Sequence, residues 1–178
     1  NHLSFATEDG AVAAITMSNG YGSGITVPGT GITFNNSLGE PELNPQGFFR
    51  MPPGGRFVSN MCPVTGWTNS GTAVAMGSPG ASRITTSLFQ GWINFAMEGM
   101  DARSATMAPR FHVENIDDVF TLQHEPGVDT SLAQNIFKLR AFPAPDMYFG
   151  ALNIAGRDHR GALFASADTR RHGSEFVN

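Results

Sequence analysis

Cysteine is almost absent from this chain, because Cys62 is the only one among 178 residues. A disulfide bond within the chain is therefore excluded. Basic residues are sparse too: 11 Lys and Arg against 15 Asp and Glu leave a net charge of −4, which argues against a protein that binds nucleic acid through clustered positive charge. No apolar run reaches the ~18–20 residues that a membrane-spanning helix requires, so no membrane span is predicted.

Charged residues of both signs are also few, at 15% of the chain against roughly 25% in typical soluble domains. Glycine and phenylalanine are frequent, with 21 and 14 residues, and this composition predicts a surface partly covered by another chain. The five histidines include no pair at metal-ligand spacing, so no metal site is predicted. The Met and Phe content fits a core and a subunit interface better than a cofactor site, so no cofactor is predicted. Because no repeat or boundary is visible, residues 1–178 are predicted to form a single domain.

Hydrophobic patterns predict strands at both ends of the chain and helices between them. Apolar-rich runs at residues 2–7 and 11–17 flank Glu8-Asp9-Gly10, which is a β-hairpin signal. A buried strand is predicted at 72–77, followed by a helix over 82–100 in which apolar residues recur at helical spacing.

A second, shorter helix is predicted from Asp101 to about Ala108, where Pro109 stops it. The remaining elements are two strands, a helix and a closing pair of strands, at 111–114, 119–123, 129–140, 147–155 and 162–167. This order predicts an α/β (α+β) fold in which helices pack outside sheets.

Glycine is concentrated in the stretch SNGYGSGITVPGTGITFNN, residues 18–36. Such density permits positive φ and close approach of a ligand to the backbone, so a working loop is one interpretation and a merely flexible loop the other. Residues 39–56 are rich in proline and glycine and are predicted to be irregular.

The stretch MGSPGASRI, residues 76–84, lies where a strand gives way to a helix. The backbone N–H groups near Gly80 and Ala81 are therefore predicted to lack intrahelical partners, and they could hold an anion or the oxyanion of an acyl-transfer intermediate. An ordinary structural turn is the alternative interpretation.

Four stretches in this order, GYGSGITVPGTGITFNN, GSPGASRI, APRFHVE and GALFASADTRR, resemble the small subunit of the gamma-glutamyltranspeptidases, and the similarity covers nearly the whole chain. The resemblance implies an N-terminal-nucleophile hydrolase, made as a precursor that cleaves itself into a large and a small subunit. The implied fold is a four-layer α/β/β/α sandwich that the large subunit completes.

In this family the small subunit begins with a nucleophilic Thr, typically followed by Thr or Ser and then His. Asn1-His2 matches the second and third positions, so the resemblance places the nucleophile immediately before Asn1. Its free α-amino group, with a pKa of roughly 7.7–8.0, would act as the base that activates the hydroxyl.

The resemblance assigns catalytic roles to four residues of this chain. Ser18 matches a hydroxyl that contacts the nucleophile, and Asn19 matches an Asn that hydrogen-bonds around the nucleophile, with Gly20 as the competing alignment. Gly80 and Ala81 match the pair whose N–H groups form the oxyanion hole.

Substrate recognition is where the sequence departs from the family pattern. Glu40 stands for the Asp that holds the substrate α-amino group, and Ser37 replaces a second acidic residue or Gln beside it. Ser59 retains the first of two Ser that bind the substrate α-carboxylate, whereas Asn60 replaces the second.

The resemblance therefore implies an amide hydrolase or acyltransferase, with gamma-glutamyl compounds such as glutathione as the default substrate. An amidase or acylase of shifted acyl specificity is one alternative, and a catalytically inactive relative that truly begins at Asn1 is another. A periplasmic or secreted location follows from the resemblance alone, and a dimer of heterodimers stays open.

Four further residues receive structural interpretations. His2 is predicted to be a packed strand residue, and His112 to brace Arg110 and the end of a helix. Arg83 is predicted to hold a helix and a loop together, and Cys62 to be a small buried residue.

Overall fold

The computed structural model describes residues 1–178, with the exception of the Glu42 side chain. The chain divides into two compact units, one formed by Asn1 with residues 17–60 and the other by residues 2–16 with 61–178. The single-domain organisation stays a prediction.

The larger unit begins with the hairpin that the Asp-Gly signal predicts. Strands β1 (His2–Ala6) and β2 (Val12–Thr16) pair antiparallel, and Gly10 turns the chain with a φ of 89°. Side chains alternate along β1, so that His2 is buried and Phe5 is exposed.

A four-stranded antiparallel sheet lies at the centre of this unit. Its strands are β3 (Val64–Trp67), β4 (Ala73–Gly77), β8 (Asn153–Arg157) and β9 (Leu163–Ala167), in the spatial order β3-β4-β8-β9. Every residue of β4 is buried, which confirms the strand predicted at 72–77.

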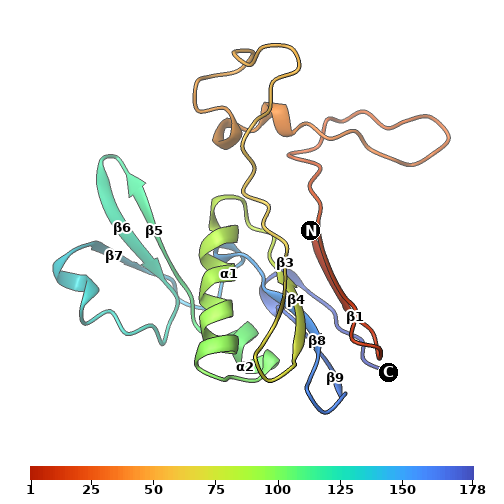
Figure 1. Ribbon diagram of the computed structural model, residues 1–178. Helices are drawn as coiled ribbons and strands as arrows, with labels where there is room; N and C mark the ends of the chain where they lie inside the picture. Colours follow the sequence, from red (N-terminus) through yellow and green to blue (C-terminus); the bar gives the residue numbers. More distant parts are fainter. The chain divides into compact units, whose positions relative to one another are not determined.

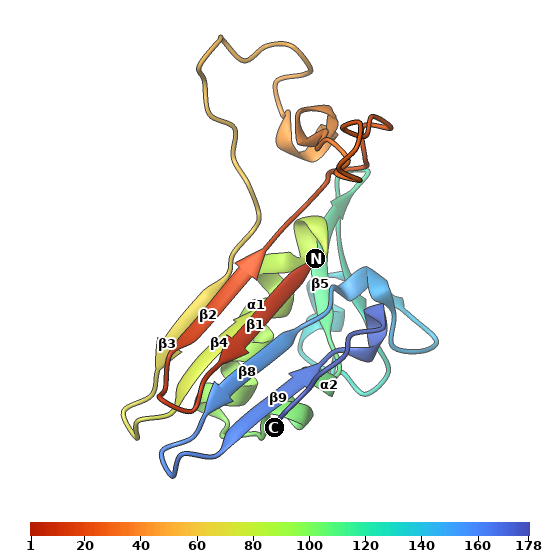
Figure 2. The ribbon, with the colours of Figure 1, turned by 90° about the vertical axis from the view of Figure 1, so that its right-hand side faces the viewer.

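Helices cover one face of this sheet and the β1–β2 hairpin covers the other (Figures 1 and 2). Helix α1 (Ile84–Trp92) continues into a π-helical turn (Ile93–Met97), and α2 (Ala102–Met107) follows, capped by Asp101. Both predicted helices are thus confirmed. The core between the sheet and the helices contains Val74, Met76, Leu88, Ala102, Ala105, Leu152 and Ile154.

A separate three-stranded sheet follows α2. Strands β5 (Phe111–Ile116) and β6 (Val119–His124) pair antiparallel through a turn at Asp117 and Asp118, and β7 (Lys138–Ala141) pairs parallel with β6. The two strands predicted at 111–114 and 119–123 are confirmed.

The helix predicted over residues 129–140 is wrong. This segment forms only one 3₁₀ turn (Ala133–Asn135) before β7 begins, and Leu132 and Ile136 are 85% and 72% exposed. Without a buried apolar face the segment lacks the packing that stabilises a short helix, and pairing with β6 extends its second half instead.

The closing strand pair is confirmed except at its start. Residues Met147–Phe149 form a short 3₁₀ helix, η6, and β8 begins only at Asn153. The mixed α and β fold is confirmed, with a two-stranded layer, a four-stranded layer and a helical layer stacked in that order.

The smaller unit has little regular structure. An isolated bridge joins Thr26 and Thr33 in the glycine-rich stretch, and two 3₁₀ turns follow, η1 (Ser37–Gly39) and η2 (Pro41–Leu43). The irregular backbone predicted over 39–56 is otherwise confirmed. None of the helices in the described part of the chain combines the length and apolar character that a membrane span requires.

Candidate active site

The turn after β4 has an unusual backbone. Gly80 has a φ of 144° and Ala81 a φ of 51°, and the 3₁₀ turn η3 (Ala81–Arg83) then leads into α1. A Cβ added at Gly80 would lie 2.9 Å from the Gly150 Cα, so only glycine fits there. Ala81 carries a Cβ in the left-handed region, which costs on the order of 1–2 kcal/mol.

This conformation leaves two backbone donors available. The N–H groups of Gly80 and Ala81 meet no hydrogen-bond acceptor among the residues that the structure describes. Gly80 is buried and Ala81 is exposed, so the pair lies at the boundary between the protein interior and solvent. Two adjacent, rigidly held N–H donors are what stabilisation of a carbonyl oxyanion requires.

The segment after η6, which contains Gly150 and Ala151, packs against this turn. The buried Ser78 hydroxyl accepts the Ala151 N–H at 2.9 Å and donates to the Pro79 carbonyl at 2.7 Å. Gly150, with a φ of 79°, packs so closely that an added Cβ would lie 2.8 Å from Ser78 Oγ. The turn and the Gly150 segment are therefore fitted to each other.

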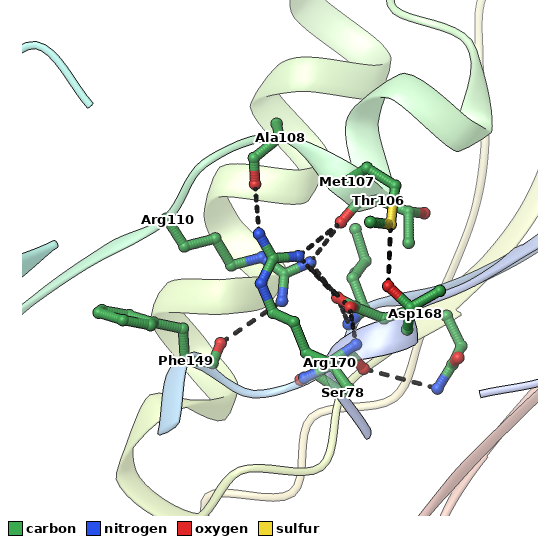
Figure 3. Close-up of polar contacts among 12 residues, drawn as sticks. Ser78, Thr106, Met107, Ala108, Arg110, Phe149, Asp168 and Arg170 are labelled. Carbon is green, nitrogen blue, oxygen red and sulfur yellow. Dashed lines mark hydrogen bonds and ion pairs between the residues drawn. The ribbon is translucent and has the colours of Figure 1, made fainter. Parts of the chain in front are cut away.

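A buried network of two arginines and two carboxylates fixes that segment. Figure 3 shows three of its members, Arg110, Arg170 and Asp168. Arg110 pairs with Asp168 at 2.6 Å, and Arg170 contacts Glu125 at 2.5 Å and Asp168 at 3.2 Å. All four side chains are at most 3% exposed. Burial lowers the pKa of Arg110, while the neighbouring Asp168 opposes that effect.

The network also binds the backbone around it. Asp168 accepts the N–H of Leu152 at 3.1 Å, and Arg110 donates to the Phe149 carbonyl at 3.5 Å. Glu125 accepts the N–H groups of Arg110 and Asp146, both at 3.0 Å. The APRFHVE and GALFASADTRR stretches carry the family resemblance, but no pattern within them indicates this network, because the Arg and Asp residues meet only in the fold.

His2 connects the start of β1 to the strand that precedes the turn. Its ring bonds to Thr16 Oγ1 at 2.8 Å and to Ser4 Oγ at 2.9 Å, and it lies against Gly77, where a Cβ would overlap it. Burial lowers the pKa of His2 to about 4. The ring is therefore neutral at pH 7, and the interpretation as a packed strand residue is confirmed.

The other structural interpretations have mixed outcomes. His112 bonds to Thr86 Oγ1 at 2.8 Å and so braces β5 against α1, and Arg83 joins η3 to the Tyr148 carbonyl at 3.1 Å. Cys62, in contrast, is exposed, so its prediction as a buried residue is wrong. It lies in residues 56–63, which have no regular secondary structure and contribute nothing to the buried core.

In the smaller unit, Ser18 and Asn19 lie beside the Asn35–Ser37 stretch. The Ser18 hydroxyl accepts the Gly20 N–H at 2.9 Å, and the Ser18 carbonyl accepts the Asn35 amide. The Asn19 carbonyl accepts the Asn36 N–H at 3.2 Å. Ser18 and Asn19, which are predicted to surround the nucleophile, thus lie close to Ser37, which is predicted to bind the substrate.

Two acceptor oxygens of this unit are buried without a donor among the described residues, Glu40 Oε1 and Asn36 Oδ1. They flank η1, whose first residue, Ser37, is 8% exposed. Further along, Ser59 is exposed and Asn60 half-buried. Because a buried acceptor without a donor is costly, the η1 region is suited to a ligand that carries N–H groups.

The chain belongs to the gamma-glutamyltranspeptidase family, since the sequence model of that family matches residues 1–177. The glutathione hydrolase proenzyme of Bacillus subtilis is 25% identical over 177 residues, which are 97% of this chain and 30% of that protein. The acylase ACY 1 proenzyme of Pseudomonas sp. strain SE83 is 30% identical over 135 residues, with 75% of this chain and 24% of that protein covered. This chain therefore spans less than a third of the length of either curated relative.

The fold of the family is shared as well. The solved gamma-glutamyltranspeptidase from Pseudomonas nitroreducens, complexed with L-DON, superposes with a TM-score of 0.76 at 23% identity. The match covers 99% of this chain and 98% of the solved chain.

Removing one carboxylate from the buried network is expected to destabilise the protein strongly. Asp168→Asn keeps the side-chain shape but leaves Arg110 without its ion pair, which should lower the free energy of unfolding by about 3–5 kcal/mol. Urea unfolding of the intact protein measures this loss. Arg103→Gln, which breaks the exposed Arg103–Glu175 pair, is the control and should cost about 1 kcal/mol or less. Equal losses in both variants would contradict the role of the network.

His2 should make stability depend on pH. Its pKa is about 4 in the folded protein against an ordinary value of 6.5 for an exposed histidine, so the unfolded chain binds more protons between these values. Stability should therefore rise as the pH increases from about 4 to about 6.5, and His2→Gln should show a weaker rise. Urea midpoints across this range, compared between the two proteins, give the contribution of His2. Identical slopes would show that this ring does not titrate as inferred.

Proposed function

We propose that this chain is the catalytic part of an amide hydrolase or acyltransferase that acts on gamma-glutamyl compounds, with glutathione as the default substrate. The observation that carries the proposal is the turn at Gly80 and Ala81, whose two N–H groups are unpaired and held in place. Family membership and the names of the curated relatives support the reaction class.

The proposed nucleophile is a threonine immediately before Asn1, which the match of Asn1-His2 to the family motif supports. Its hydroxyl attacks the amide carbonyl and its proton passes to the free α-amino group of the same residue. The carbonyl electrons move onto oxygen, where the N–H groups of Gly80 and Ala81 stabilise the negative charge, an effect worth about 10²–10³-fold in rate per donor.

Collapse of this intermediate completes acylation. The C–N bond breaks, the ammonium group returns its proton to the leaving amine, and an acyl ester remains on the threonine. Water or an acceptor amine then attacks the ester by the same route. In this scheme Ser18 and Asn19 orient the nucleophile through hydrogen bonds.

Recognition of the acyl group is assigned to the smaller unit. The buried oxygens of Glu40 and Asn36 support binding of a charged α-amino group. Ser59 and Asn60 are proposed to bind the α-carboxylate. Since Ser37 has a shorter side chain than the family's acidic residue or Gln, one contact to the amino group is weakened at this position.

A large subunit from the same precursor is the proposed partner. The outer face of the β1–β2 hairpin is apolar and open, with Leu3, Phe5 and Ile15 exposed by 46%, 51% and 46%. Exposed apolar surfaces of this kind mark protein interfaces. The fourth layer of the expected sandwich would cover this face of the hairpin. The relatives' names as proenzymes and their more than threefold greater length support this assignment. Export to the periplasm or medium is proposed from the resemblance.

An acylase of different specificity is the second candidate function. The changes at Ser37 and Asn60 favour it, because a site that loses hydrogen-bonding partners binds the original ligand less well. The similarity to an acylase proenzyme supports it as well.

Two anilides that differ only in the α-amino group separate these candidates. For a gamma-glutamyl enzyme, the intact protein should prefer gamma-glutamyl anilide to glutaryl anilide. Glu40→Gln should then lower kcat/KM for the gamma-glutamyl compound by about 10–100-fold, because a hydrogen bond to a charged group is lost, and leave the glutaryl compound unaffected. Glu8→Gln, at an exposed carboxylate, serves as the control. Preference for glutaryl anilide without an effect of Glu40→Gln would select the acylase.

The nucleophile is tested by the mass of the natural chain. Mass spectrometry of the active protein should show a chain that begins with threonine directly before Asn1 and gains one acyl group during turnover. A natural chain that begins at Asn1 would refute the threonine mechanism and select the inactive relative.

A further inference from the structure

Arg83 follows the oxyanion turn directly and reaches across to η6. Its Nε donates to the Tyr148 carbonyl at 3.1 Å and its Nη1 to Ser82 Oγ at 2.7 Å. The guanidinium carbon also lies 4.5 Å from the centroid of the Tyr148 ring, within cation–π distance. One side chain of η3 is thus held by both the backbone and the ring of Tyr148.

Tyr148 is itself fixed at both ends. Its N–H donates to Asp146 Oδ1 at 2.7 Å, and its hydroxyl donates to Glu114 Oε2 at 2.8 Å. Burial, and secondly the hydrogen bond to Glu114, raise the pKa of Tyr148 to about 12, so the hydroxyl stays protonated and can donate at neutral pH. The ring stacks on Phe142 with centroids 5.3 Å apart. This arrangement makes Tyr148 a rigid platform.

The turn needs such a platform because few other contacts hold it. Ala81 is in the left-handed region and η3 has three residues. Its backbone bonds run from the Arg83 N–H to the Gly80 carbonyl at 2.9 Å and from the Ile84 N–H to the Ala81 carbonyl. The Ser78 and Gly150 contacts fix the residues before Ala81, but not those after it. Arg83 on Tyr148 supplies the second support.

We propose that Tyr148 is a positioning residue for the oxyanion turn and that it acts through Arg83. This inference rests on the proposed function, in which Gly80 and Ala81 stabilise the oxyanion. Tyr148 sets the angle of η3 and with it the direction of the Ala81 N–H. A donor displaced by about 1 Å costs roughly 10²-fold in rate, so a remote contact can control kcat.

The test uses the intact protein and whichever anilide the wild type turns over. Tyr148→Ala removes the ring, and kcat should fall by about 10–100-fold while KM stays within about twofold, since ground-state binding is assigned to other residues. Tyr148→Phe keeps both the ring and the carbonyl and should restore most of the activity. Arg140→Ala is the matched control. The guanidinium carbon of Arg140 also lies over an aromatic ring, 5.5 Å from the centroid of Phe142, but Arg140 does not contact η3.

Coupling between the two residues provides a readout that general destabilisation would not mimic. Arg83→Met should lower kcat as Tyr148→Ala does, and the double variant should be no worse than either single one. If Tyr148→Ala does not fold, Arg83→Met alone tests the contact: its kcat should fall by about 10–100-fold while KM stays within about twofold.

Unchanged kcat, a change in KM alone or additive effects in the double variant would overturn the positioning role. Failure of the wild type to cleave any of the anilides would instead overturn the proposed function.

Discussion

The pairing of Arg110 and Arg170 with Asp168 and Glu125 is the interaction on which the larger unit depends. Four charges are buried together, and each would be costly if its partner were missing. Arg110 lies just before β5, Glu125 just after β6, and Asp168 and Arg170 just after β9, so these strands must dock together before the charges are neutralised. The same side chains satisfy backbone groups of Phe149 and Leu152, which ties the network to the segment behind the candidate oxyanion turn.

The turn itself is held from two directions. Ser78 and Gly150 fix its first half through close packing and a buried hydrogen bond, and Arg83 fixes its second half on Tyr148. A strained backbone persists only where its surroundings determine it, and here both sides do so. The result is a pair of N–H donors whose direction is set before a substrate arrives, which is the physical requirement for stabilising a transient oxyanion.

The smaller unit contains the residues that are proposed to recognise the acyl group. Its buried acceptors at Glu40 and Asn36 lack donors among the described residues, whereas its changes at Ser37 and Asn60 affect side chains assigned to acyl-group recognition. A proposed catalytic role that depends on a backbone N–H group, such as that of Ala81, tolerates a change of side chain because the N–H group remains. Recognition of the acyl group depends on side-chain oxygen and nitrogen atoms, so the substrate specificity can change while the reaction stays the same.

The sequence by itself determined the features that local interactions decide. The β1–β2 hairpin follows from its Asp-Gly turn, α1 from its apolar spacing and the end of α2 from Pro109, and the oxyanion turn follows from Gly80 between a strand and a helix. Only the tertiary structure decided the features whose partners are distant in sequence. Residues 129–140 were expected to be helical, but pairing with β6 makes the second half a strand. Arg170 meets Glu125 across 45 residues and Arg83 meets Tyr148 across 65, and no local pattern specifies such partners.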